Sequence, residues 1–148
     1  MFLLDTDTII YNLKGNDAVT KNLRQHIEDP IKISIVTLME LYFGAYKSEK
    51  VAVNLAKVRT IEHSFEVIAA DKGSAEIYGM LKAALEKSGT SLDDFDLIIA
   101  ACALAHNLML VTNNIKHFIR VEGLKLTNWS VYPESQILSS KNEGKTEI

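Results

Sequence analysis

The chain has 148 residues, of which 47% are hydrophobic and 24% charged, which indicates one folded domain and excludes an intrinsically disordered protein. Its formal net charge of −3 does not favour a non-specific nucleic-acid binder, although a metal ion on clustered carboxylates would lower that deficit. The single cysteine, Cys102, excludes an intrachain disulfide; there is no basic leader and no apolar stretch of about 18 residues, so we expect a cytoplasmic protein without a membrane span.

Apolar, β-branched runs alternate with helical spacing along the chain. In chain order the expected elements are a strand at 2–4, helices at 7–14 and 17–29, a strand at 31–36, helices at 37–46 and 49–63, a strand at 66–68, helices at 72–87 and 94–106, a strand at 108–112, a short helix at 114–120 and an edge strand at 124–126. Strands that alternate with helices predict a mainly parallel sheet covered on both faces, which is a three-layer α/β domain. We expect this domain to span residues 1–132, followed by a polar, flexible tail at 133–148.

Three carboxylates are expected at one edge of this sheet. Asp5 ends the first strand, and Glu40 and Asp96 are each expected in the first turn of a helix. The fourth strand ends in Thr112 and is followed by Asn114, which adds polar oxygens at the same edge. Ligands of parallel α/β sheets bind outside the carboxyl ends of the strands, so these side chains form the candidate site.

Phosphodiester hydrolysis is the chemistry that needs such an arrangement. Mg²⁺ prefers carboxylate oxygens, water and phosphate as ligands, and it activates a water while it neutralises charge on the phosphate. No covalent nucleophile is evident, and the four histidines lack metal-ligand spacing.

Each acidic residue also has a structural explanation. The segments 37–40 and 91–94 both fit a capping box, and Asp7 is a suitable N-cap for the first helix. However, Asp5, Glu40 and Asp96 stand in apolar surroundings and would repel one another without a cation. A shared metal ion is therefore the favoured explanation.

Five segments, in order over residues 2–129, resemble the motifs of the VapC-type PIN-domain ribonucleases, the toxins of type II toxin–antitoxin systems. They are Leu3-Leu4-Asp5-Thr6-Asp7, Ser34-Ile35-Val36-Thr37-Leu38-Met39-Glu40-Leu41, Phe95-Asp96-Leu97-Ile98-Ile99-Ala100-Ala101, Val111-Thr112-Asn113-Asn114 and Gly123-Leu124-Lys125-Leu126-Thr127-Asn128-Trp129. The resemblance implies a PIN-like domain with a five-stranded parallel sheet flanked by helices, and a Mg²⁺-dependent endoribonuclease for which Mn²⁺ is an alternative metal. It also implies an RNA substrate such as tRNA, a cognate antitoxin and a homodimer.

By the same resemblance, Asp5, Glu40 and Asp96 match the acidic triad that binds the metal. Asn114 stands at a fourth site that is often Asp, and Thr112 is expected to position a water or the Asn114 side chain. Asp93 and Asp94 replace a Gly-Pro pair, which leaves open whether either joins the metal site.

Basic and aromatic residues near the site are candidate RNA contacts, although a solvated surface or a core position is the more frequent role of any one of them. The basic candidates are Lys14, Lys47, Lys50, Lys116 and Arg120. Tyr42 and Tyr46 are alternatively expected to serve the antitoxin groove that such a helix forms in the family.

Two other functions remain open. Asp5-Thr6-Asp7-Thr8 approaches the opening motif of haloacid dehalogenase-type phosphatases, but the chain has no Gly-Asp dipeptide for the metal motif of that class. The second is a PIN-fold binding module with little or no turnover, which the neutral Asn114 at the fourth position keeps open.

Overall fold

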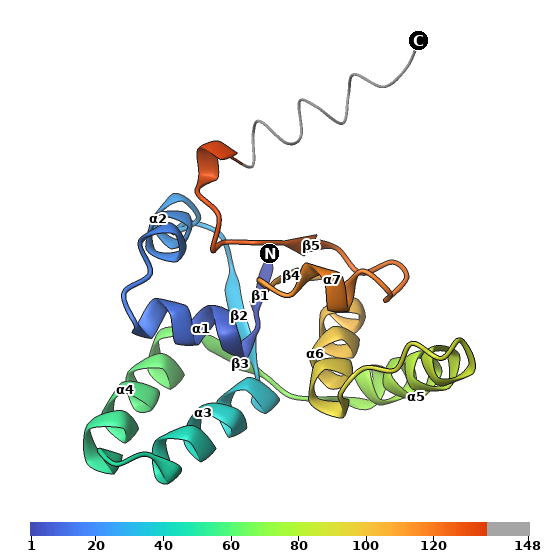
Figure 1. Cartoon of the computed structure of the whole chain (residues 1–148), viewed down its shortest axis with the longest axis horizontal. Coiled ribbons are helices and arrows are strands. Elements are labelled where there is room, and N and C mark those ends of the chain that lie inside the picture. Colours follow the sequence, from blue (N-terminus) through green and yellow to red (C-terminus); the bar gives the residue numbers. More distant parts are fainter. Residues whose placement is uncertain (136–148) are drawn as a thin grey trace.

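The computed structural model describes residues 1–135, which contain a five-stranded sheet with all neighbouring strands parallel and the order β3-β2-β1-β4-β5 (Figure 1). The strands are β1 (Phe2–Leu4), β2 (Ile31–Ser34), β3 (Glu66–Ile68), β4 (Met109–Val111) and β5 (Leu126–Thr127). The helices are α1 (Thr6–Leu13), α2 (Asp17–Gln25), α3 (Ile35–Lys47), α4 (Val51–Ser64), α5 (Lys72–Lys87), α6 (Asp94–Ala105) and α7 (Ile115–Phe118). The predicted three-layer α/β fold with a parallel sheet is confirmed.

Neighbouring residues of a strand supply the cores on the two faces of the sheet. In β1, Leu3 belongs to the core beneath α5 and α6, whereas Leu4 belongs to the core beneath α1, α3 and α4. Both side chains are fully buried. Figure 1 shows α1 to α4 on one side of the sheet and α5 to α7 on the other. This division follows from the two-residue period of a strand, which sends successive side chains to opposite faces.

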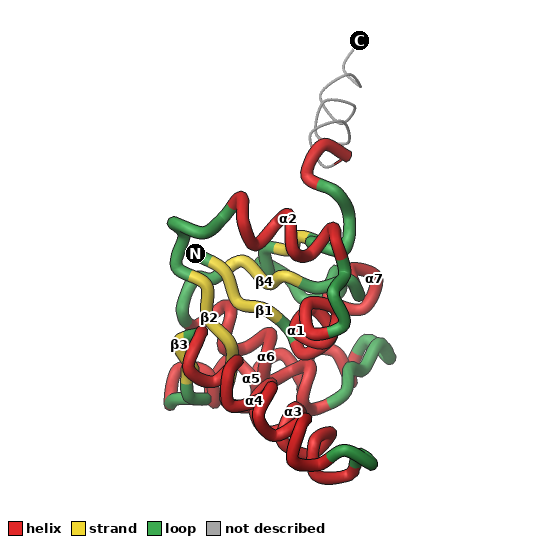
Figure 2. The backbone as a smooth tube through the Cα atoms, turned by 90° about the vertical axis from the view of Figure 1, so that its left-hand side faces the viewer, coloured by secondary structure: helices red, strands yellow, loops and turns green. Residues whose placement is uncertain are grey.

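The strand order changes direction at β1. Strands β2 and β3 lie on one side of β1, and β4 and β5 lie on the other side, so the connections after β1 and β4 lead away from each other. Leu4 pairs with Val111 at the carboxyl ends of β1 and β4, and Figure 2 shows β1 between β2 and β4. The crevice of an open α/β sheet forms at such a reversal, because the flanking connections leave toward opposite faces.

Two predicted element boundaries were wrong at this edge. The strand expected at 31–36 ends at Ser34, which caps α3 by accepting a hydrogen bond from the backbone N–H of Thr37 at 3.0 Å. Asp7 is not the cap of α1, because Asp5 holds that position. In both places a buried side-chain oxygen just after or at a strand end accepts a hydrogen bond from a free N–H of the next helix. At the start of α3, this capping outweighs the β preference of Ile35 and Val36.

The described chain ends within the predicted tail. Residues 133–135 are helical, and residues 136–148, the rest of that tail, lie outside the described residues. Cys102 is fully buried in the core. Within residues 1–135, no helix combines the length and the apolar character that a bilayer crossing requires.

Candidate active site

Asp5 is held rigidly where β1 passes into α1. One carboxylate oxygen, Oδ1, accepts a hydrogen bond from the backbone N–H of Thr8 at 2.8 Å, and the Asp5 backbone N–H donates to the carbonyl of Val111 at 3.0 Å. The residue is only 5% exposed. Burial raises the pKa of this carboxyl, while hydrogen bonds from Thr112 and Thr8 act in the opposite direction. Asp5 therefore caps its own helix and is also a buried acid beside the end of β4.

Glu40 lies one helical turn further along α3 than the sequence predicted. Because α3 starts at Ile35, Glu40 stands in its second turn, and the cap is Ser34 rather than Thr37. The capping-box explanation for Glu40 is therefore wrong. Its carboxylate Oε1 instead accepts a hydrogen bond from the hydroxyl of Thr6 on α1, at 2.7 Å. Glu40 is thus turned from α3 toward the end of β1.

Asp96 lies in the first turn of α6, as predicted, and is partly buried. Its pKa is raised to about 6, first by burial and then by the negative charges of Asp93 and Glu40, with a smaller contribution from Asp5, while His117 acts in the opposite direction. The His117 Nδ1 lies 3.9 Å from an Asp96 oxygen. The electrostatic coupling of Asp96 to Glu40 and Asp5 means that the three acids of the predicted triad share one neighbourhood.

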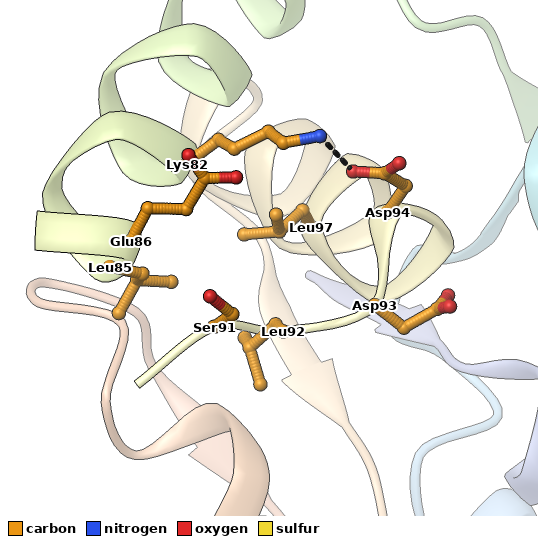
Figure 3. A pocket seen from close by; sticks show the side chains of 8 residues that line it. All are labelled: Lys82, Leu85, Glu86, Ser91, Leu92, Asp93, Asp94 and Leu97. Atoms are coloured by element: carbon orange, nitrogen blue, oxygen red, sulfur yellow. Dashed lines mark hydrogen bonds and ion pairs between the residues drawn. The ribbon is translucent and has the colours of Figure 1, made fainter. Parts of the chain in front are cut away.

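The two acids that precede Asp96 differ in what they contact. Asp94 accepts hydrogen bonds from Lys82 at 2.8 Å and from the Tyr78 hydroxyl at 2.9 Å, and these lower its pKa. Figure 3 shows Asp94 and Lys82 pointing toward each other across a hollow of about 250 Å³, while Asp93 points away from them. Asp93 caps α6 and raises the pKa of Asp96, so of the two acids it is Asp93 that acts electrostatically on the triad.

Thr112 links the end of β4 to Asp5. Its hydroxyl accepts a hydrogen bond from the backbone N–H of Asn114 at 2.9 Å, and it also contacts the Asp5 carboxyl. The Asn114 side chain makes no capping hydrogen bond to α7. The structure therefore places Thr112 against the backbone of Asn114 rather than its side chain, and that amide is not committed to the helix start.

The donor set fits a hard divalent cation in its chemistry. It consists of carboxylate oxygens that are partly withdrawn from water, and the charges of Glu40 and Asp5 raise the pKa of Asp96, which is the situation that a bound cation relieves. Within residues 1–135, however, no three His, Cys, Asp or Glu side chains already stand at metal-ligand spacing. Mg²⁺ commonly takes only one or two protein carboxylates and keeps water for its other positions, so a loose carboxylate set is compatible with it.

Sequence reasoning missed two side chains of this neighbourhood and assigned a third differently. Thr6 could have been suspected from its position next to Asp5, whereas nothing in the sequence places His117 beside Asp96. Arg120, a candidate RNA contact, donates instead to the backbone carbonyls of Thr90 and Ser91 at 3.3 and 3.1 Å. This bond ties the residues after α7 to the segment that leads into α6.

An apolar groove borders the acids. It has a volume of about 570 Å³ and is lined by Thr6, Asp7, Ile10, Met39, Glu40, Phe43 and Phe95. Met39, Phe43 and Phe95 are 54%, 66% and 43% exposed, so large apolar side chains stand in water beside negative charge. A second hollow of about 350 Å³ shares Ile10 with this groove and lies among residues of α1, α3 and α4. Exposed apolar surface of this extent indicates a binding surface.

Comparison with known proteins gives both a family and individual relatives to which the chain is similar. A model of the PIN domain family matches residues 2–124. The chain is 36% identical to the tRNA(fMet)-specific endonuclease VapC of Shigella flexneri, covering 87% of this chain and 98% of that protein. It is 37% identical to ribonuclease VapC2 of Rickettsia felis, again covering 87% of this chain and 98% of that protein.

Solved structures give the same picture. The crystal structure of VapBC2 from Rickettsia felis bound to a promoter DNA fragment contains a chain with a TM-score of 0.82 and 36% identity, covering 86% of this chain and 98% of that one. The DNA-bound VapBC of Salmonella typhimurium contains another, also with a TM-score of 0.82, at 34% identity, covering 86% of this chain and 97% of that one.

Proposed function

The chain belongs to the PIN domain family as a VapC-type ribonuclease, and we propose that it hydrolyses RNA with a divalent metal ion held by Asp5, Glu40 and Asp96. It is an endoribonuclease and the toxin of a toxin–antitoxin pair. The observation that carries the assignment of the site is the coupling of the partly buried Asp96 on α6 to Glu40 on α3 and to Asp5 between β1 and α1. Because the chain belongs to the PIN domain family, it is not a phosphatase of the haloacid dehalogenase type.

Mg²⁺ is the proposed metal, with Mn²⁺ as an alternative. Bound beside the three acids, the ion would supply positive charge against the phosphate and lower the pKa of water. Asp5 would hold it from a fixed position, because the helix start and Thr112 fix the carboxyl. Asp93 would add negative charge nearby, and the Asn114 amide would offer a neutral oxygen. We assign Asp94 no part in the site, because Lys82 and Tyr78 engage it.

RNA is the proposed substrate, and tRNA is its proposed class. The support for tRNA is the name of the Shigella flexneri relative, a tRNA(fMet)-specific endonuclease. The metal would offset the negative charge of the acids, which otherwise repels a phosphate backbone. His117, exposed on α7 and near Asp96, is a candidate donor to a phosphate oxygen.

A cognate antitoxin is the proposed occupant of the apolar groove. The Rickettsia felis and Salmonella typhimurium structures are VapBC complexes, so those toxins assemble with an antitoxin. In this chain, exposed Met39 and Phe43 stand next to Glu40, a combination that suits a segment carrying both apolar and basic side chains. Such a segment would cover the acids and block access of RNA, which is how binding would inhibit the nuclease.

A homodimer is also proposed. Away from the acids, Met80 of α5 is 61% exposed and Ile119 after α7 is 70% exposed. Met80 lines a hollow of about 400 Å³ together with Arg120 and Glu122. Light scattering on the purified protein, alone and after substitution of Met80 by Glu, tests whether this surface holds two copies together.

The decisive experiment compares two acids of one helix turn. We expect purified protein with Mg²⁺ to cleave a tRNA(fMet) transcript, EDTA to stop the cleavage, and Asp96→Asn to abolish it. Asp94→Asn is the matched control and should cleave like the unmodified chain, because Asp94 is engaged by Lys82. Equal loss in both variants would contradict the proposed site. RNA binding without cleavage at any metal concentration would instead favour the binding module.

A further inference from the structure

The neighbours Asp5 and Thr6 are connected with two of the three acids of the proposed site. Asp5 is itself one of them, and the Thr6 hydroxyl lies 2.7 Å from the Glu40 carboxylate, 34 residues away along the chain. This bond joins the first turn of α1 to the second turn of α3. Among residues 1–135, Thr6 is the only hydrogen-bond donor to the Glu40 carboxylate.

The direction of this hydrogen bond is fixed by chemistry. A carboxylate can only accept, and a hydroxyl carries a single proton, so Thr6 must give its proton to Glu40. The Thr37 hydroxyl lies 3.2 Å from that of Thr6, where it is a more distant acceptor of the same hydroxyl. Ser34 lies 3.4 Å from Thr37 and accepts from the Thr37 backbone N–H.

Thr6 is thereby held between Glu40 and the buried amino end of α3, where Ser34 and Thr37 are both fully buried. Without the Thr6 hydroxyl, Glu40 would be a long side chain on a partly exposed helix surface, free to rotate among several rotamers.

We propose that Thr6 is a positioning residue, whose hydroxyl holds the Glu40 carboxylate in the orientation in which it serves a divalent metal. This inference rests on the proposed metal-dependent function. It assigns Thr6 no contact with substrate or metal: the residue acts only through Glu40. Groups that orient a metal ligand in this way change metal affinity or activity by about 10- to 100-fold when they are removed.

The test measures Mn²⁺ affinity by isothermal titration calorimetry on the full chain, alongside thermal unfolding of the metal-free protein. Thr6→Val keeps the shape of the side chain and removes the hydroxyl, and we expect it to weaken Mn²⁺ binding by about 10- to 100-fold. Thr6→Ser restores the hydroxyl and should recover most of the affinity. Thr60→Val is the matched control, because Thr60 is exposed on α4 and donates only to its own helix at Ala56.

A double-mutant cycle separates positioning from a general structural effect. If Thr6 acts through Glu40, Thr6→Val should have no further effect on Mn²⁺ affinity once Glu40→Gln is present. Additive losses in the double variant would overturn the proposal, since they would mean that the two residues act independently. Should Thr6→Val fail to fold, Thr6→Ala in the same cycle gives the same comparison.

The failures of the two hypotheses are distinguishable. If Glu40→Gln weakens Mn²⁺ binding and Thr6→Val does not, the role of Thr6 is overturned and the proposed function stands. If the unmodified chain binds no Mn²⁺ at millimolar concentration, both are overturned.

Discussion

The two ends of β1 differ in the side chains that surround them: aromatic rings at the start and acidic groups at the end. At its start, Phe2 packs against Trp129 with ring centroids 5.0 Å apart, and His26 stacks on Trp129 at 5.1 Å with the planes inclined by only 6°. Asp5 follows its last residue, and the burial of this acid disfavours its charged form. The first end is closed by ring packing, whereas the second keeps charges that repel one another.

Polar groups follow the same division. Near the aromatic end, the buried Asn22 side-chain amide donates to the carbonyls of Trp129 at 3.1 Å and Val131 at 2.9 Å, which fastens the segment after β5 to α2. At the acidic end, Asp96 has His117 no closer than 3.9 Å and has acids around it. The aromatic end thus stabilises the fold, whereas the acidic end carries the residues of the proposed metal site.

The largest expected effect is at the aromatic end. Trp129 is 1% exposed, so Trp129→Ala removes a fully buried ring and should lower the free energy of unfolding by about 3–5 kcal/mol. Chemical denaturation measures this change. Trp129→Phe keeps a ring in the cluster and should be milder. A loss below that of Trp129→Phe would contradict the idea that this end is where packing stabilises the fold.

The second effect concerns the acidic end when a cation is added. Metal that binds only the folded protein should raise the free energy of unfolding by about 2.7 kcal/mol at a concentration 100 times its dissociation constant. Denaturation with and without Mn²⁺ measures the gain. Asp94→Asn should keep it, whereas Asp96→Asn should lose most of it at the same Mn²⁺ concentration. An equal gain in both variants would place the bound metal elsewhere.

A third effect tests the polar fastening near the aromatic end. Asn22→Ala leaves the buried carbonyls of Trp129 and Val131 without this donor and should lower the free energy of unfolding by about 1–3 kcal/mol. Asn54→Ala is the matched control, because Asn54 donates to the partly buried Ser48 hydroxyl. We expect a smaller loss there. Equal losses would mean that burial of the acceptors has no special weight.

The smallest expected effect is a gain in stability when Asp96 is replaced in metal-free protein. In metal-free protein the pKa of Asp96 rises from its ordinary value of 3.8 to about 6, so the folded state binds more protons than the unfolded state between these values. Stability therefore falls as the pH rises through that window, and the loss persists above it. Asp96→Asn should unfold at a higher temperature than the unmodified chain at pH 7 in EDTA, and this advantage should vanish near pH 4. A lower unfolding temperature at pH 7 would reverse the comparison.

The pattern of the sequence was sufficient for the fold, and it singled out acids that the structure brings into one neighbourhood. Apolar runs that alternate with helical spacing lead to a parallel sheet, and a carboxylate such as Asp5 at the end of an apolar strand is conspicuous without any coordinates. It was not sufficient for the boundary between β2 and α3. There, β-branched Ile35 and Val36 favour a strand locally, but Ser34 caps a helix that includes both.

Local pattern by itself determined that the strands run parallel and which edge of the sheet carries the acids, because the alternation of strands with helices and the polarity of strand ends are properties of neighbouring residues. Tertiary structure alone decided which acid is neutralised and which is not. Asp94 meets Lys82, Asp96 meets other acids, and Glu40 meets Thr6. Lys82 and Thr6 lie on other helices than the acids that they contact, and only the packing of those helices fixes the distances on which such interactions depend.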